Sequence, residues 1–195
     1  MPAATFLPPR SDLLSHCGRA AHDLGLAALL GGQLFGRLAL HPAVTAIADQ
    51  RERGAVINAA WRRYGAVNGV GLLAVTAGWT AARAGQARDR YLVPRERRLA
   101  RAKDVLVAAT FVTGAATATE GVRFARQAPG GAVPLTDGDH AAPAAPDRAR
   151  RLKRTLNALG VVAIATEAAL VGVNAALDQT AWRRAPLRRR LRRGS

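Results

Sequence analysis

Glu167 is the residue of this sequence with the clearest chemical potential. It is the only charged residue between Thr155 and Leu177. Gly160, Glu167 and Asn174 recur every seven residues, so a helix presents all three on one face. A carboxyl group in so apolar a segment needs a purpose or a partner. It can bind a proton, a cation or a polar group of a substrate. The alternative is a neutral carboxyl group hydrogen-bonded to a neighbouring helix.

A second candidate group combines opposite charges with amides. Arg37 and Glu120 each interrupt an otherwise uncharged segment. If the two halves of the chain are aligned, their depths differ by about 3 Å, which predicts an ion pair. The alternative is that Arg37 reaches the membrane surface with its long side chain and that Glu120 lies at a helix end. Asn68 and Asn157 fall near the same level, so the four residues are predicted to form one polar cluster.

The sequence carries no recognisable catalytic or cofactor motif. His16, His22, His41 and His140 have no metal-ligand spacing with one another or with Cys17. Neither a phosphate-binding loop nor a dinucleotide fingerprint is present. We therefore assign no catalytic residue and no metal ligand, and the cofactor, if any, is unknown.

The distribution of charge indicates the elements that position these residues. The chain has 195 residues, 29 of them Lys or Arg against 13 Asp or Glu. Yet the 19 residues from Tyr64 to Ala82 carry no charge, and a helix of that length spans about 28 Å of the roughly 30 Å hydrocarbon layer. The alternative is a soluble bundle of Ala-rich helices. We predict an all-α bundle of four transmembrane helices, near 21–40, 64–83, 104–122 and 155–177.

The remaining segments complete the predicted organisation. Residues 1–20 are expected to form a flexible leader before a membrane domain at 21–182. Residues 127–147, rich in Pro and Gly, are expected to be a flexible linker without a fold. Residues 183–195 form a basic tail. The apolar spacing within 41–61 predicts an amphipathic helix on the membrane surface.

The basic residues predict orientation and partners. Four spans place both termini and the central loop on one side, which holds 17 of the 29 basic residues. The positive-inside bias then predicts a multi-pass protein of the cytoplasmic membrane with both termini in the cytoplasm. The predicted partner is a bilayer with anionic head groups. A homo-oligomer is a further option, and nucleic acid is disfavoured.

The two halves of the sequence resemble each other. The segment 23–28, DLGLAA, matches 104–109, DVLVAA, and 67–75, VNGVGLLAV, matches 156–164, LNALGVVAI. Both matches predict two duplicated two-helix hairpins. Asp23 and Asp104, which begin the matched spans, are expected to be structural because a carboxylate is favoured at a helix N-terminus. The alternative is chance similarity between Ala/Gly/Val-rich segments.

This layout resembles small bacterial four-helix membrane proteins, including the anthrone-oxygenase-like and DoxX-like groups. The resemblance covers most of the chain as architecture, so no catalytic residue is carried over from it. The Ala/Arg/Gly-rich composition is typical of high-GC bacteria. The expected function is a non-enzymatic transport, scaffold or envelope component. One alternative is a membrane-embedded enzyme or redox partner for a lipophilic substrate, with Arg37, Glu120 and Glu167 lining its pocket. Another is a basic soluble helical protein that binds nucleic acid.

Overall fold

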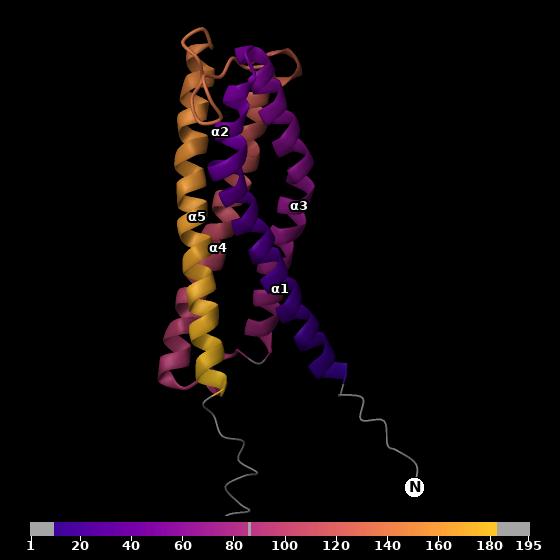
Figure 1. Cartoon of the computed structure of the whole chain (residues 1–195). Coiled ribbons are helices and arrows are strands. Elements are labelled where there is room, and N and C mark those ends of the chain that lie inside the picture. Colours follow the sequence, from indigo (N-terminus) through magenta and orange to yellow (C-terminus); the bar gives the residue numbers. More distant parts are fainter. Residues whose placement is uncertain (1–9, 86, 183–195) are drawn as a thin grey trace, which may run out of the picture.

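The computed structural model describes residues 10–85 and 87–182, and it shows a bundle of four long helices (Figure 1). The helices are α1 (Arg10–Phe35), α3 (Gln50–Ala84), α4 (Pro94–Ala125) and α5 (Asp147–Trp182). Each belongs to a segment long and apolar enough to cross a membrane: Cys17–Ala46, Gln50–Ala84, Pro94–Ala125 and Asp147–Thr180. The predicted all-α, four-span architecture is thus confirmed, and each segment contains its predicted span.

Short helical turns connect the long helices. After α1 the chain forms a π-helical turn, η1 (Gly36–Leu40), then α2 (His41–Ala43) and η2 (Val44–Ala46). The turn η3 (Asp89–Tyr91) lies between α3 and α4, and η4 (Pro129–Gly131) follows α4. We call the end with α2 and the α4–α5 connection the loop end. The opposite end, where α1 begins and α5 stops, is the terminal end (Figure 1).

The helices pack as two hairpins that also contact each other. α1 packs chiefly on α3 and α4 on α5, while α1 also contacts α5 and α3 contacts α4. The first helix of each hairpin therefore touches the second helix of the other, as a two-fold arrangement of duplicated hairpins requires. The packing agrees with the predicted duplication, which stays a prediction.

The interior holds two apolar clusters, and much of the outside is apolar as well. One cluster, toward the terminal end, contains Leu26, Val75, Trp79, Val107 and Leu170. Large apolar side chains also remain exposed on the outer faces of the helices, among them Leu24, Leu38, Val70, Leu73, Val105 and Val112. Such faces are stable against lipid tails, so the fold suits a bilayer.

The leader and the surface helix expected from the sequence are corrected by the structure. Helix α1 already begins at Arg10, so residues 10–19 are helical rather than a flexible leader. The surface helix expected within 41–61 is not a separate element, because 50–61 is the first part of α3. The Asp49 side chain caps this helix by accepting a hydrogen bond from the Arg51 N–H at 2.7 Å. Residues 1–9 and the tail 183–195 lie outside the described residues.

The predicted flexible linker 127–147 is irregular but packed. Val133 and Leu135 are fully buried in the second apolar cluster, together with Ile57 of α3 and Phe124 of α4. The Leu135 N–H donates to the Gln50 carbonyl oxygen at 2.9 Å. The expectation of no fold is wrong because alternating apolar residues within the Pro/Gly-rich segment bury themselves across the end of the bundle.

Gly54 of α3 marks the closest approach of this linker. A Cβ built at Gly54 would lie 1.9 Å from the carbonyl oxygen of Val133, a backbone atom that cannot turn aside. Only a residue without a side chain allows this contact. Gly65 lies about three turns further along α3, and a Cβ built there has nothing within 4 Å.

Replacing Gly54 by Ala is expected to lower the free energy of unfolding by about 1–3 kcal/mol, because an overpacked contact forces the backbone to shift. Thermal unfolding in detergent, followed by far-ultraviolet circular dichroism, measures the change. Gly65→Ala is the matched control and should not destabilise the helix, since Ala is the better helix former. Equal stability of the two variants would contradict the packed linker.

Candidate functional site

Asp139 in the α4–α5 connection gathers polar side chains at the loop end. Its Oδ1 accepts from His41 Nδ1 at 2.9 Å and from Arg37 Nη1 at 3.3 Å. Trp61 Nε1 of α3 donates to the other ring nitrogen of His41 at 3.2 Å. Asn157 Nδ2 of α5 donates to the Asp139 carbonyl oxygen at 2.6 Å. We call these five residues the loop-end cluster. It joins η1, α2, α3 and α5 around one residue, Asp139.

The π-helical turn aims Arg37 and His41 at the same acceptor. Pro42 has no N–H and cannot continue regular α-helical hydrogen bonding, so the chain widens before it. The His41 N–H instead donates to the Gly36 carbonyl oxygen, five residues back. Such π-bulges re-aim side chains and are frequent at functional sites.

The neighbouring turn of the linker is held by its own carboxylate. Asp137 Oδ1 accepts from the backbone N–H groups of Asp139 and His140 at 2.7 and 2.8 Å, and from the His140 ring at 2.9 Å. Partial burial opposes ionisation, but these hydrogen bonds outweigh it and lower the pKa of Asp137. The turn therefore keeps its negative charge through neutral and mildly acidic pH.

A second set of polar residues lies at the terminal end, where it ties the two hairpins together. Trp79 Nε1 of α3 donates to Asp104 Oδ1 of α4 at 2.7 Å, and Arg83 Nε donates to the same oxygen at 3.1 Å. Asn174 Nδ2 of α5 donates to Asp23 Oδ1 of α1 at 3.2 Å. Asp23 and Asp104 were expected at helix N-termini, but they lie inside α1 and α4, where their carboxylates accept these hydrogen bonds between the hairpins. Their structural role stays a prediction.

Arg83 also anchors the α3–α4 connection. It pairs with Asp89 at 2.9 Å, and Arg101 pairs with the other oxygen of this carboxylate at 3.2 Å. Hydrogen bonds from both guanidinium groups lower the pKa of Asp89.

Glu167 lies between the two ends, buried and unsatisfied. Glu167 is only 3% exposed, and its Oε2 has no hydrogen-bond partner among the described residues. No ion pair within 4 Å involves it in the described part of the chain. Thr110 of α4, 2% exposed, also has a buried hydroxyl without a partner. The centre of the bundle thus holds two polar groups that no other described residue satisfies.

The structure brings together only part of the polar cluster predicted from the sequence. Arg37 and Asn157 meet through Asp139. The predicted Arg37–Glu120 ion pair does not form, since Glu120 pairs with Arg123 at 2.6 Å on its own helix. Asn68 lies seven residues beyond Trp61 along α3, which places it about 10 Å deeper than the loop-end cluster. The pair was predicted wrongly because Asp139, in the supposed linker, is the acid that returns to Arg37.

Three residues that the sequence did not single out belong to these sites: Asp139, Lys103 and Lys153. The two lysines are 7% and 6% exposed, respectively. A signal for Lys103 was its place seven residues before Thr110, on the face of α4 that points inward. Asp139 had no comparable signal, because the partners of its carboxylate, Arg37 and His41, lie 102 and 98 residues away in the chain.

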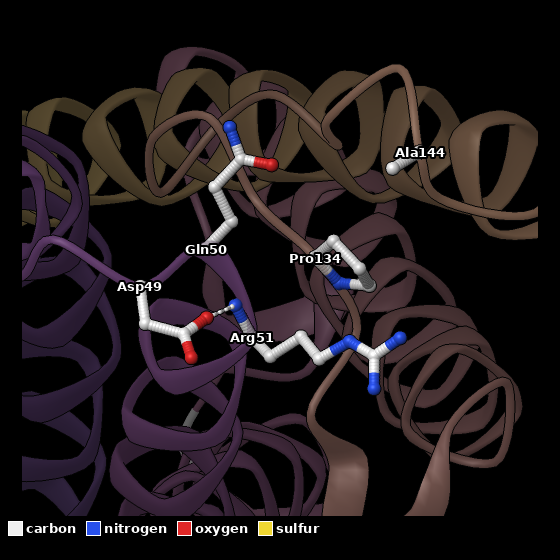
Figure 2. Close-up of a pocket in the computed structure, with 5 residues that line it drawn as sticks. All are labelled: Asp49, Gln50, Arg51, Pro134 and Ala144. Carbon is white, nitrogen blue, oxygen red and sulfur yellow. Dashed lines mark hydrogen bonds between the residues drawn. The ribbon is translucent and has the colours of Figure 1, made fainter.

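The cavity shown in Figure 2 lies at the loop end, and Glu167 is not among the residues that line it. It has a volume of about 390 Å³, opens widely to solvent and forms between the start of α3 and the linker. Its lining consists of Asp49, Gln50, Arg51, Pro134 and Ala144. The Asp49 carboxylate is already occupied by the Arg51 N–H. In the described residues, no group of three His, Cys, Asp or Glu side chains is placed to hold a metal ion.

Replacing Asp139 by Asn should release the linker, because Arg37 and His41 lose the charged acceptor that they share. Hydrogen bonds to charged groups contribute about 1.5–3 kcal/mol each. Hydrogen–deuterium exchange should accelerate in peptides covering 133–142. Asp147→Asn, which changes an exposed pair with Arg150, should leave that exchange slow. Unchanged protection in both variants would rule out Asp139 as the anchor.

Comparison of the chain with protein-family models, with curated proteins and with solved structures returns no match.

Proposed function

We propose that this protein is a membrane transport component in which Glu167 binds a proton or a small cation midway across the bilayer. The observation that carries the proposal is the buried Glu167 carboxyl group, whose Oε2 has no partner among the described residues. A carboxylate costs several kcal/mol to bury in an apolar medium unless its charge is balanced. Since no described side chain supplies a balancing charge within ion-pair distance, a proton or a cation must supply it.

The position of Glu167 supports a transport role over a structural one. Along α5 it lies seven residues from Asn174, at the terminal end, and ten from Asn157, at the loop end. These separations correspond to about 10 and 15 Å. The group therefore lies deep in the span, with polar residues toward both surfaces. Intramembrane acids in this position mark ion pathways in pumps and transporters.

The alternative functions have less support. A pocket for a lipophilic substrate was expected to combine Arg37, Glu120 and Glu167. Arg37 and Glu120 instead have separate partners, Asp139 and Arg123, and Glu167 lies apart from both ion pairs. Binding of nucleic acid requires a continuous basic face. Here the basic residues gather at the two ends, and the exposed helix faces between them carry Val and Leu.

The orientation that fits best has the terminal end in the cytoplasm. Arg88, Arg90, Arg95 and Arg98 are exposed around the α3–α4 connection at that end. Tyr91, 54% exposed, has the Arg90 guanidinium stacked 4.7 Å from its ring centre. An aromatic ring between arginines suits the head-group layer of an anionic leaflet. Both termini of the chain would then be cytoplasmic.

This orientation predicts a labelling pattern, which the single cysteine of the chain makes simple to test. In a Cys17→Ser background, Ala144→Cys at the loop end should react with a membrane-impermeant maleimide in intact cells. Arg88→Cys at the terminal end should react only after the membrane is permeabilised. Both positions are exposed in the structure. The reverse pattern would place the termini outside the cytoplasm.

Replacing Glu167 by Gln should reduce ion flux at least ten-fold, because Gln keeps the shape of the side chain but cannot exchange a bound proton or cation. The measurement is flux of H⁺, Na⁺ and K⁺ in proteoliposomes containing the purified full-length chain. Glu120→Gln is the matched control, since it removes a carboxylate already paired with Arg123.

The control variant should keep the flux of the wild type. Circular dichroism and size-exclusion chromatography establish that each variant is folded. A Glu167→Gln variant that is folded and transports at the wild-type rate would refute the proposed role of this residue.

A further inference from the structure

Polar side chains recur at intervals along one face of α4 and one face of α5, and we call this pair of rows the polar seam. On α4, Lys103, Thr110 and Thr117 recur every seven residues, and on α5, Lys153, Gly160, Glu167 and Asn174 do the same. Each set therefore lies along one helix face. The two helices are antiparallel neighbours, and Lys153 of α5 lies over Phe124 of α4, with Nζ 5.8 Å from the ring centre.

That contact sets the register of the seam. Fourteen residues along each helix from the Phe124–Lys153 contact, the chain reaches Thr110 on α4 and Glu167 on α5. Seven further residues reach Lys103 and Asn174. Equal steps along antiparallel helices stay at equal depth. Thr110 and Glu167 consequently share the central level, and Lys103 and Asn174 share the level at the terminal end.

The seam holds four of the seven buried side-chain atoms that lack a hydrogen-bond partner in the described part of the chain; the other three are His22 Nε2, Asn68 Oδ1 and Arg97 Nε. Thr117 Oγ1, Thr110 Oγ1, Glu167 Oε2 and Asn174 Oδ1 are all buried and lack a hydrogen-bond partner in the described part of the chain. Buried polar atoms are ordinarily paired, so each exception needs an explanation. Four exceptions in the seam are explained together if the seam conducts a species that hydrogen-bonds to each of them in turn.

Each end of the seam holds a buried lysine. Lys103 Nζ lies 4.3 Å from the Trp79 ring centre, and Asp23 of α1 and Asp178 of α5 are the acids that attract it. Lys153, at the loop end, is attracted by Asp139 and Asp137. Neither ammonium group forms an ion pair within 4 Å in the residues that the structure describes. Along the seam, Glu167 therefore lies between these two amines.

Resting on the proposed function, we infer that the species bound by Glu167 is a proton rather than a metal cation, and that protons reach it along the polar seam. A Na⁺ or K⁺ ion would have to pass an ammonium group at either end, and like charges repel strongly where water is scarce. A proton does not have to pass as an ion, since hydroxyl and amine groups accept and release protons in place.

This proton transfer needs no co-reactant, because each bond that forms is later broken. A proton from one surface reaches the Glu167 carboxylate and forms the neutral acid. The same O–H bond breaks when the proton leaves toward the other surface, which restores the carboxylate. The hydroxyl groups of Thr110 and Thr117 divide the path into steps that water molecules bridge, as in other polar sites of protein interiors.

The experiment measures proton, Na⁺, K⁺ and Cl⁻ flux in the same proteoliposomes of the full-length chain, with the membrane potential clamped. The wild type should move protons and none of the other ions. Thr110→Val removes one hydroxyl at nearly constant volume and should lower proton flux several-fold. Thr119→Val is the matched control on α4, because Thr119 is exposed and bonds the carbonyl oxygen of Ala115. It should leave proton flux unchanged.

The lysines supply a second readout. Lys103→Met should admit Na⁺, since it removes the ammonium group at one end while keeping the length of the side chain. Lys153→Met tests the other end and serves as the second variant if Lys103→Met does not fold. The proposal that protons move along the seam would be overturned if Thr110→Val leaves proton flux unchanged. It would also be overturned if the lysine variants do not conduct Na⁺.

The outcomes also separate this inference from the proposed function. If the wild type carries Na⁺, K⁺ or Cl⁻ and Glu167→Gln abolishes that flux, transport through Glu167 stands and the proton assignment falls. If no ion moves in a Glu167-dependent way, both proposals fall.

Discussion

The hydrocarbon interior of a membrane offers no hydrogen-bond partners, and the arrangement of this protein follows from that constraint. Its backbone meets the requirement through four long helices whose peptide groups bond within each helix. Its charged side chains meet it by gathering at the two ends, where Asp139 joins Arg37 to His41 and where Asp104 joins Trp79 to Arg83. Between the ends, apolar side chains face outward as well as inward. A polar group that stays in the middle is therefore exceptional, and Glu167 is such a group.

The two ends hold the bundle in complementary ways. At the terminal end, the Trp79–Asp104 and Asn174–Asp23 hydrogen bonds each join one hairpin to the other. At the loop end, a single irregular segment lies across the helices and is held by buried Val133 and Leu135 and by the bonds of Asp139. Helices tied at both ends cannot easily separate in the middle. A polar seam between α4 and α5 can then keep unsatisfied groups without lipid entering between the helices.

The sequence predicted features that follow from composition over many residues, and missed those that depend on one distant contact. The four spans could be located because each is a run of suitable length with at most two charged residues. Glu167 could be singled out because it interrupts such a run. The linker was predicted to be unfolded because it is rich in Pro and Gly. Two apolar residues within it, Val133 and Leu135, nevertheless pack at Gly54 and Ile57. The prediction of an Arg37–Glu120 ion pair was wrong for a related reason. Once that segment folds back, Asp139 lies closer to Arg37 than any acid on another span.

The sequence by itself therefore determined the number of helices, their approximate bounds and the presence of a carboxyl group deep within the fourth. Burial of uncharged runs and the length needed to cross a bilayer are local properties, and they need no knowledge of neighbours. Only the tertiary structure decided which polar groups are satisfied. Whether Asp139 closes the loop end, or whether Thr110 meets Glu167 at one level, depends on the register of helices far apart in the chain. That register is set by close packing, as where Gly25 lies against Gly71, and close packing is a property of pairs of surfaces rather than of any single segment.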